Sequence, residues 1–560
     1  MDPKDRLPIF LVLAALLQAP AAALAPPALG ASAADTDPAL VGAWSAPIEG
    51  EATAITMVLL HDGRVLYWSG HEVQPSDDPL RVDILLEPLL PAQTRIYDPR
   101  TGAVTQPHYR FTSHMDIFCA GQVPLADGRI LAAGGTRYAP LHAPGGPVAG
   151  LREAWVFDPL VDDWVPVSSM ADARWYPSVI GDREGRAWAV SGMEVLGDSS
   201  TYSVRPEVYD GSDDTWTRAG ESERLLPMYP RVTMVPGGPL KGQMFYNAVG
   251  DLWGPFGQHP AEAQWALQQA YDPAADAWRF LGPSMLGARH HAASVMLPLR
   301  AETGYAPQFL TFGGTLHRAP VATPAAEIAD LSTDPPTNRL VAPMNEGRWH
   351  ANGVLLPDGT VMAVGGGRTD NTVLLGTASP PVLTGEIYDP EADAWRVTAP
   401  MQAPRVYHST AVLLPDARVL VGGHSTTPLP PKLARDILRP QEQETRLEIF
   451  SPPYLFRGAR PVIEALGATY VTHGDDLAVR LEDAHDVHSA VLMRPGATTH
   501  AFDSAQRAIV LEVSAQAERD LVVRMPPDAD VAPPGWYMLF VNGDHPAGPV
   551  PSVAAWVHVS

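Results

Sequence analysis

Tyr407 and His408 are adjacent in the sequence, and they offer two kinds of metal donor, a phenolate oxygen and an imidazole nitrogen. Both donors are of the kind that suits copper. The single thiol of the chain, Cys119, lies in a separate segment over residues 114–121. Spacing alone leaves a copper site built on these residues as a hypothesis.

Cys119 has three interpretations at this point. The chain has no second cysteine, so an intrachain disulfide is not available even if the protein is exported, as its N-terminal residues described below predict. The thiol is therefore a buried bystander, an intermolecular linker or a chemically used group. Composition by itself favours the buried bystander.

Arginine followed by aromatic or imidazole side chains recurs along the chain. The pattern stands at residues 174–176, 289–291, 348–350 and 405–408. Equivalent positions in repeated units lie at one level, so these groups could converge on one end of a common axis. The plainer explanation is that such arginines and aromatic rings pack between units and bond to loop carbonyls.

These residues belong to a repeated pattern that must position them. Each copy has an apolar strand, an Asp-Gly type turn, a second strand ending in Gly-Gly, a variable loop, a Tyr-Asp-Pro strand and a tryptophan before a closing turn. The plainest copies include residues 354–395 and 127–164, and weaker copies start near residues 60–63, 182, 236–238, 296 and 413–416. Each copy predicts a four-stranded unit.

About seven such units fit between residues 42 and 460, and their paired glycines look like kelch repeats. A small sheet of this kind cannot bury both faces alone, whereas closure into a ring protects its faces and edges. We therefore expect an all-β fold with a seven-bladed kelch-type β-propeller over residues 42–460. Alternating strands at residues 477–481 and 536–540 predict an immunoglobulin-like β-sandwich of the early-set type over residues 461–560.

The formal net charge of −24 argues against binding to phosphate backbones or anionic lipid. We therefore expect no nucleic-acid partner.

Residues 1–33 have the features of a signal peptide: Lys4 and Arg6, then an apolar run, then small residues at 31–33. A retained anchor is the alternative, but prolines at 20, 26 and 27 interrupt the run before it reaches the roughly 20 residues of a spanning helix. We expect a secreted, periplasmic or cell-surface protein that has no spanning segment after processing.

Four segments resemble the ligand segments of the galactose oxidase and glyoxal oxidase family of copper-radical oxidases, in that family's order. They lie at residues 116–121, 173–176, 405–409 and 496–500. Residues 226–231 and 534–540 extend the similarity over nearly the whole mature chain. The final segment lies after the repeats, so the resemblance implies that a loop of the C-terminal domain reaches the propeller's central channel.

The resemblance also implies a set of roles. Cys119 would form a thioether with the ring of Tyr176, and Tyr176, Tyr407, His408 and His500 would bind one copper ion. The cross-linked tyrosine would hold a radical and Tyr407 would accept a proton while a primary alcohol or hydrated aldehyde is oxidised. Dioxygen would be the acceptor, leaving as hydrogen peroxide.

Two departures from the family pattern affect these expectations. The aromatic group that stacks on the cross-linked tyrosine in galactose oxidase falls at Met193 or Glu194 here. Glu194 is therefore a candidate neighbour of the radical, with two alternatives: a negative charge beside it, or a side chain that points to solvent. The repeats begin almost directly after the signal peptide, which is closer to the glyoxal oxidase arrangement, so galactose is not the default substrate.

Loops around Tyr202, Trp253, His259 and Trp265 could build a substrate pocket. The remaining histidines have a structural or surface interpretation, because no motif match makes them ligands; they include His61, His71, His114, His259, His290, His291, His350 and His424. We expect a monomer. Two rival functions stay open, a non-catalytic kelch protein that binds carbohydrate or cell wall, and an inactive relative that binds copper.

Overall fold

Almost every regular element in the described part of the chain is a β-strand. The structure is a computed structural model that describes residues 36–69, 94–108, 115–138, 148–195, 198–251, 262–316, 319–370, 379–424, 443–484 and 486–560. The expected signal peptide lies outside these residues, as do His71, His114, Trp253 and His259. None of the helices in these ranges is long and apolar enough to span a membrane.

The helical elements among the described residues are all short. They are α1 (Pro38–Val41), α2 (Glu262–Trp265) and the 3-10 turns η3 (Ser199–Thr201), η5 (Ala301–Thr303) and η6 (Pro453–Phe456).

Seven sheets with four blade strands each account for most of the described strands. The first is β3 (Thr56–Leu59), β4 (Val65–Trp68), β5 (Thr94–Asp98) and β6 (Ala103–Thr105). The second is β8 (Gly121–Pro124), β9 (Ile130–Ala133), β12 (Ala154–Asp158) and β13 (Asp163–Val167). The third is β14 (Ser178–Gly181), β15 (Ala187–Val190), β16 (Glu207–Asp210) and β17 (Thr215–Arg218).

The remaining four sheets continue the same order. The fourth is β18 (Val232–Met234), β19 (Met244–Tyr246), β21 (Leu267–Asp272) and β22 (Ala277–Pro283). The fifth is β24 (Ala293–Met296), β25 (Gln308–Phe312), β27 (Ala326–Asp330) and β28 (Thr337–Val341). The sixth is β29 (Asn352–Leu355), β30 (Val361–Val364), β31 (Thr384–Asp389) and β32 (Ala394–Pro400), and the seventh is β33 (Ser409–Leu413), β34 (Val419–Gly423), β35 (Arg446–Ser451) and β1 (Ala43–Trp44).

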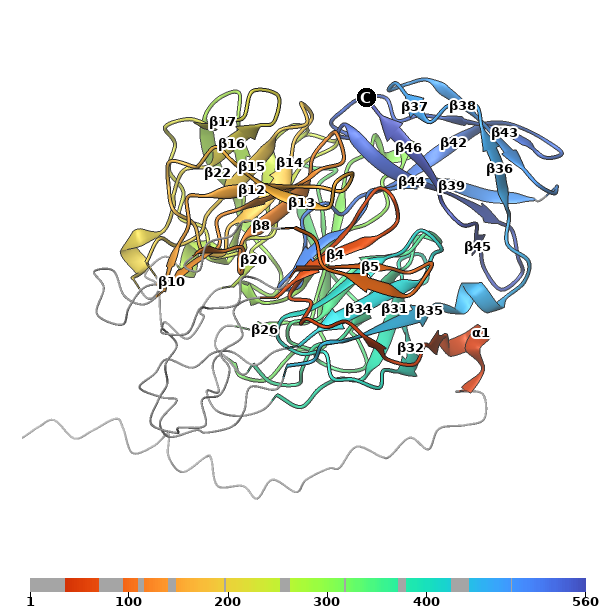
Figure 1. Ribbon diagram of the computed structural model, residues 1–560, viewed down its shortest axis with the longest axis horizontal. Coiled ribbons are helices and arrows are strands. Elements are labelled where there is room, and N and C mark those ends of the chain that lie inside the picture. Colours follow the sequence, from red (N-terminus) through yellow and green to blue (C-terminus); the bar gives the residue numbers. More distant parts are fainter. Residues whose placement is uncertain are drawn as a thin grey trace, which may run out of the picture.

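The seven sheets are the blades of a β-propeller, as the repeats predicted (Figure 1). The first strands of most neighbouring blades lie against one another around the axis. The last blade is completed by the other end of the chain, because Ala43 pairs with Ser451 and Trp44 with Phe450. The short strand β2 (Ile48–Glu49) also pairs with β35. This pairing closes the ring and removes the free edge of the seventh blade.

The repeated sequence signals have local physical causes. In the Asp-Gly turn between β8 and β9, Gly128 has a φ of 91°, and the Asp127 carboxylate accepts a hydrogen bond from the Arg129 amide at 3.0 Å. A β-carbon on Gly423, at the end of β34, would lie 2.3 Å from the carbonyl oxygens of both Ala54 and His408. Glycine at that point lets the second strand run directly under the turn of the neighbouring strand.

The recurring arginines have the structural role that the plainer explanation predicted. Arg174, Arg289, Arg348 and Arg405 are fully buried, and each lies beside a buried glutamate in the third strand of its blade: Glu207, Glu327, Glu386 or Glu448, at 2.9, 3.7, 2.7 and 3.0 Å. Removing one partner would leave a buried charge uncompensated, which costs about 3–5 kcal/mol. These pairs therefore hold the turns that follow each arginine.

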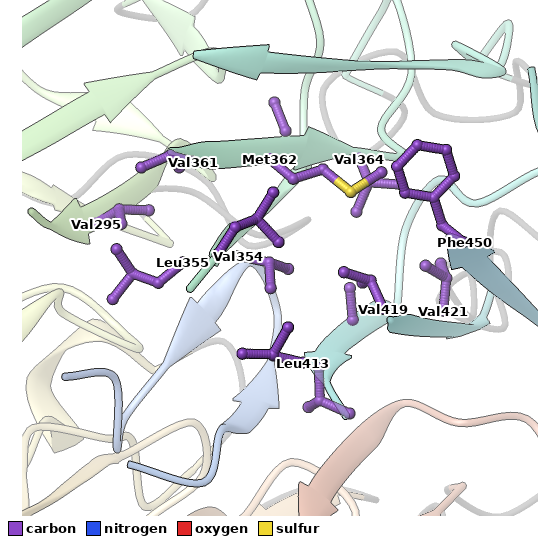
Figure 2. Close-up of a cluster of buried hydrophobic side chains, with 14 of the residues drawn as sticks. Val295, Val354, Leu355, Val361, Met362, Val364, Leu413, Val419, Val421 and Phe450 are labelled. Carbon is purple, nitrogen blue, oxygen red and sulfur yellow. The ribbon is translucent and has the colours of Figure 1, made fainter. Parts of the chain in front are cut away.

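Apolar side chains fill the space between blades. Figure 2 shows Val295 from the fifth blade, five residues of the sixth and Leu413, Val419, Val421 and Phe450 of the seventh in one cluster. All of these labelled side chains are buried. Each fully buried valine or leucine stabilises the fold by about 1.5–3 kcal/mol relative to an exposed one. The core is thus shared around the ring rather than enclosed in each blade.

Two small sheets of three strands are present in addition to the blades. One contains β7 (Met115–Asp116), β10 (Thr136–Tyr138) and β11 (Val148–Gly150). The other contains β20 (Val249–Gly250), β23 (Arg289–His290) and β26 (Thr315–Leu316).

The C-terminal strands form a curled sheet that packs on one side of the propeller (Figure 1). Its strands are β36 (Ile463–Leu466), β37 (Tyr470–Val471), β38 (Asp476–Leu481), β39 (Val487–Met493), β42 (Ala508–Ala517), β43 (Asp520–Arg524), β44 (Gly535–Gly543), β45 (Val550–Pro551) and β46 (Ala555–Val559). The long strand β42 pairs with β39 in its first half and with β43 in its second, with a register shift between Val513 and Ala515. Both halves contribute to one buried cluster, so the sheet folds over itself as a sandwich.

That cluster also contains Phe245 and Phe309 from the fourth and fifth blades, so the core of the sandwich continues into the propeller. Main-chain bonds join the two parts as well, because Leu299 donates to Ala508 and accepts from Val510, both at 2.9 Å. A hairpin of β40 (Ala497–Thr499) and β41 (Phe502–Asp503) leaves the sandwich and pairs with β3 of the first blade. This hairpin therefore enters the ring at the axis.

Candidate metal centre

A turn with left-handed backbone geometry precedes the first strand of six blades. The residues at these turns are Cys119, Tyr176, Tyr229, His291, His350 and His408, with φ values of 62°, 61°, 40°, 48°, 61° and 62°. Non-glycine residues rarely adopt positive φ, and such strain concentrates at functional sites. Each of these turns presents its side chain at the axis, where the rings of different blades meet.

Main-chain hydrogen bonds join these turns from blade to blade. The amide of Tyr176 donates to the carbonyl of Cys119 at 3.0 Å, and the amide of Tyr229 donates to Tyr176 at 2.8 Å. The amide of His350 donates to the carbonyl of His291 at 3.1 Å. These bonds satisfy backbone groups that would otherwise be buried without partners.

His500 reaches the same place from the C-terminal hairpin. Thr499 pairs with Phe502 across a two-residue loop in which His500 and Ala501 have φ values of 47° and 59°. Positive φ at both loop positions is the pattern of a type I′ turn, which normally selects Asn or Gly. The buried Arg231 side chain fixes the hairpin by donating to the carbonyls of His500 at 2.5 Å and Tyr229 at 2.7 Å.

The predicted ligand residues converge on one buried point. The hydroxyl oxygen of Tyr176 lies 2.9 Å from that of Tyr407 and 3.0 Å from Nε2 of His500. The ring of His408 lies 3.9 Å from the Tyr407 ring and 4.7 Å from the His500 ring, centroid to centroid. None of these four side chains is more than 3% exposed. Residues separated by 324 positions in the chain, Tyr176 and His500, thus share one site.

The tautomer of His500 follows from the hydrogen bonds of Thr499. The Thr499 hydroxyl donates to the Ile55 carbonyl at 3.1 Å, and its oxygen accepts from the Thr56 hydroxyl at 3.2 Å. The Thr499 hydroxyl oxygen can then accept one further hydrogen bond, and it lies 2.8 Å from Nδ1 of His500. Nδ1 therefore carries the proton, and the Nε2 lone pair faces Tyr176 and is available to a metal.

Burial sets the charge state of this pocket in the absence of a metal. It raises the pKa values of the Tyr176 and Tyr407 phenols well above their usual value. It also lowers the pKa values of His408 and His500 well below theirs. The four groups are consequently neutral at pH 7, and a bound divalent cation would favour the phenolate forms. Two oxygen donors and two imidazoles in one dry pocket fit copper(II).

Cys119 is 1% exposed and packs in the same cluster as Tyr176, with Trp175, Met193, Met228 and Tyr229. Burial raises the pKa of the Cys119 thiol well above its usual value, although hydrogen bonding to Tyr176 opposes that rise. The thiol is therefore protonated and in contact with the tyrosine to which the resemblance joins it.

The aromatic neighbours of Tyr176 come from unexpected positions. The ring of Trp175 lies 3.8 Å from the Tyr176 ring and Tyr229 lies 4.6 Å away, centroid to centroid. Met193 is buried and exchanges main-chain hydrogen bonds with Trp175, both at 2.9 Å. The Glu194 side chain is exposed, in agreement with the alternative in which it points to solvent. The family resemblance predicts the aromatic group at position 193 or 194, whereas the left-handed turn at Tyr176 brings the ring of Trp175 against that of Tyr176.

Two of the four residues considered for a substrate pocket are described. Trp265 is fully buried, and its ring lies 6.1 Å from that of the half-buried Tyr202. Outside the axis, His61 stacks on Trp536 of the sandwich at 5.2 Å, and His424 is buried with its carbonyl accepting from Glu444.

Sequence reasoning passed over several groups that lie at the axis. His291 and His350 were set aside as structural or surface residues, yet their rings lie 5.8 and 5.0 Å from that of Tyr407, and both are fully buried. Tyr229 lies 4.7 Å from the His500 ring. The recurrence of imidazole two positions after the buried arginine was the signal that could have identified His291 and His350.

Comparison with known proteins gives consistent matches. A family model described as "Glyoxal oxidase N-terminus" matches residues 288–454, and one described as "Galactose oxidase-like, Early set domain" matches residues 460–559. A galactose oxidase from Gibberella zeae is 28% identical over 518 residues, which are 89% of this chain and 67% of that protein.

Two further matches involve other oxidases. The aldehyde oxidase GLOX of Vitis pseudoreticulata is 33% identical over 228 residues, or 38% of this chain and 41% of that protein. A solved structure described as a novel fungal alcohol oxidase with catalytic diversity among the AA5 family, in complex with copper, aligns with a TM-score of 0.72 and 25% identity. The alignment covers 93% of this chain and all of that one.

Proposed function

We propose that this chain, which belongs to the galactose oxidase and glyoxal oxidase family of copper-radical oxidases, oxidises small primary alcohols or hydrated aldehydes and reduces dioxygen to hydrogen peroxide. One observation carries the proposal: the Tyr176 hydroxyl lies 2.9 Å from that of Tyr407 and 3.0 Å from Nε2 of His500 in a buried pocket. That convergence joins two blades and the C-terminal hairpin.

Tyr176, Tyr407, His408 and His500 are the proposed ligands of one copper ion. When bound, copper supplies a position for the substrate oxygen and accepts one of the two electrons that the substrate loses. Because a single copper ion stores one oxidising equivalent, a side chain has to store the other. The ring of Tyr176 is the proposed store, since it is dry, packed by Trp175 and Tyr229 and adjacent to a thiol.

A thioether between Cys119 and Tyr176 is the proposed protein-derived cofactor. In its formation the thiol loses its hydrogen, the tyrosine ring loses one C–H hydrogen, and a C–S bond forms. The two electrons and two protons released pass to dioxygen, which becomes hydrogen peroxide. Sulfur on the ring lowers the cost of one-electron oxidation of the phenol and so stabilises a tyrosyl radical.

In turnover, Tyr407 accepts the proton of the substrate hydroxyl, and the Tyr176 radical abstracts a hydrogen atom from the carbon that bears it. An alcohol thereby becomes an aldehyde, or a hydrated aldehyde becomes an acid, with loss of two electrons and two protons. Dioxygen takes up the two electrons and the two protons and leaves as hydrogen peroxide. His500 keeps its Nε2 lone pair directed at the site because Thr499 holds the Nδ1 proton.

The propeller over residues 42–460 and the early-set sandwich over residues 461–560 act as one catalytic unit in this proposal, since each supplies ligands. Export through a signal peptide at residues 1–33, outside the cell or to a periplasm or cell surface, is the proposed localisation, with a monomer as the working form. Neither a carbohydrate-binding kelch protein nor an inactive copper binder is favoured, because neither explains a thiol kept beside the ligand tyrosine.

Formation of the cross-link is the test. The chain is produced copper-free, exposed to copper and oxygen, and examined by mass spectrometry for loss of the mass of two hydrogen atoms and for a linked Cys119–Tyr176 peptide. Peroxide release is then measured with small alcohols and aldehydes. Cys119→Ser and His500→Ala should abolish peroxide release, whereas His488→Ala, at an exposed position on the sandwich, should not. An unlinked Cys119 after this treatment would refute the proposed cofactor.

A further inference from the structure

A second group of potential metal donors lies beside the proposed copper site. Asp251 follows β20, and His290 and His291 stand at the end of β23 and in the turn after it. Parallel pairing sets Gly250 opposite His290, and the His291 amide donates to the Gly250 carbonyl at 3.1 Å. The backbone of one small sheet therefore brings the three side chains together, and all three are buried.

The donor atoms of the three residues are arranged around a common point. One ligand atom from each of Asp251, His290 and His291 lies within 4.8 Å of the others. Nδ1 of His290 lies 3.5 Å from one carboxylate oxygen of Asp251, and Nε2 of His291 lies 3.2 Å from the other. The positive φ of His291 allows two consecutive residues to face the same side, with ring centroids 4.3 Å apart.

Among the described residues, neither ring nitrogen of His291 makes an aligned hydrogen bond, although the residue is 0% exposed. Nε2 is close to Asp251 but is not aligned with it as a hydrogen-bond donor. Burying an imidazole in this way is unfavourable unless something else binds the nitrogen. The Asp251 carboxylate and Nε2 of His291 are thus close to each other without being aligned for a hydrogen bond. This arrangement is expected when both atoms are directed at a bound metal ion.

A second buried carboxylate, that of Asp370, lies on the other side of the His290 ring. This carboxylate is fully buried and lies 3.2 Å from Nε2 of His290. His290 therefore lies between two buried carboxylates, with Asp251 on the Nδ1 side and Asp370 on the Nε2 side. The two buried carboxylates also concentrate negative charge that a cation would neutralise.

We propose that Asp251, His290 and His291 bind a divalent first-row transition metal ion, of which zinc(II) is the reference, at a site separate from the four proposed copper ligands. Two imidazoles and one carboxylate are a donor set suited to such ions, with a position left for water. The site lies next to the copper pocket, because the His291 ring is 5.8 Å from that of Tyr407 and 6.4 Å from that of His500. The bound ion holds His291 in place as a wall of that pocket.

Zinc stoichiometry separates the two sites. The metal-free full-length chain is equilibrated with zinc(II), passed through a desalting column and analysed for bound metal, in four forms: wild type, His500→Ala, Asp251→Asn and the double variant. The His500→Ala chain should retain the proposed zinc equivalent, and the double variant should bind at least tenfold more weakly. Asp182→Asn, which alters a buried carboxylate in the turn between β14 and β15, is the matched control and should bind as wild type does.

A spectroscopic measurement keeps the result independent of folding in the Asp251 variant. The His500→Ala chain is loaded with cobalt(II), and its visible absorption and X-ray absorption spectra should indicate two imidazole ligands and one carboxylate. Equal zinc binding by Asp251→Asn and wild type would overturn the proposal, as would a His500→Ala chain that binds no metal. Cross-link formation at Cys119 is scored separately, so failure of the copper proposal would be distinguished.

Discussion

Replacing Thr499 by valine removes one hydroxyl from the hairpin that carries His500 and leaves the shape of the side chain almost unchanged. In the wild type this oxygen accepts from Nδ1 of His500 at 2.8 Å and from Thr56 at 3.2 Å, and its proton is donated to Ile55 at 3.1 Å. In Thr499→Val the Nδ1 proton, the Thr56 hydroxyl and the Ile55 carbonyl all lose a partner in a buried site.

The expected cost follows from those three contacts. An unsatisfied buried polar group costs about 1–3 kcal/mol, and the Thr56 hydroxyl can rotate to another acceptor, so we expect the free energy of unfolding to fall by about 2–4 kcal/mol. Loss of the group that orients a metal-bound histidine typically lowers metal affinity by about 10–100-fold. At about 1.4 kcal/mol for each factor of ten, this is about 1.4–2.8 kcal/mol of copper binding.

The assay is a competition between the protein and a chelator of known copper affinity, with unfolding by urea measured on the copper-free chain. Thr498→Val is the matched control, because Thr498 is buried in the same strand and its hydroxyl contacts Met57 at a longer 3.4 Å. Copper affinity in Thr498→Val should stay within about threefold of wild type, which corresponds to less than about 0.7 kcal/mol of binding free energy. Equal copper affinities in the two valine variants would refute the assignment of Nδ1 as the protonated nitrogen.

Three further outcomes follow from the same structure. Burial lowers the pKa values of His350 and His408 well below the usual value, so the unfolded chain binds more protons in acid than the folded chain does. As the pH falls below about 6.5, the free energy of unfolding of the copper-free protein in urea should therefore decrease by up to about 1.4 kcal/mol per pH unit for each histidine. Burial raises the pKa of Asp503 to about 6, so the contribution of the protonated carboxyl to stability is lost as the pH rises through 6. The melting temperature of Asp503→Asn relative to wild type should therefore increase between pH 4 and pH 7, and the two proteins should melt alike below pH 4. Gly423→Ala should lower the free energy of unfolding by about 1–3 kcal/mol and weaken copper binding, because the new β-carbon would clash with the His408 carbonyl. Gly359→Ala is the control, since Gly359 also has a positive φ but has open space around it, and this variant should retain copper affinity.

The fold was accessible from the sequence because its causes are local and repeated. The Asp-Gly turns, the paired glycines and the tryptophan near the end of each unit recur often enough to define the blades, and each expected start near residues 60–63, 182, 236–238 and 413–416 is the turn between the first two strands of a blade. Closure of the ring was expected in general. The strand that closes the ring was not predicted, since β1 and β35 lie at opposite ends of the repeat region and no local pattern links them.

The candidate site was accessible in part, through its motifs. Cys119, Tyr176, Tyr407, His408 and His500 were named from short segments that resemble a known family, and they converge in one pocket. Position 194 illustrates the limit of that reasoning. A side chain equivalent in sequence does not take an equivalent place, because the ring that packs on Tyr176 is supplied by Trp175 through the left-handed turn between them.

The sequence by itself determined the residue types, their repeat and hence the ring of blades, since those depend on hydrophobic pattern and turn chemistry over a few tens of residues. The tertiary structure alone decided which side chains meet. Asp251 and Asp370 are unremarkable in the sequence, and they lie beside His290 and His291 because separate blades deliver these residues to one axis. The same holds for the tautomer of His500, which depends on Thr56 and Ile55 at the opposite end of the chain. Contacts between distant segments are set by the closed ring, and no local pattern encodes them.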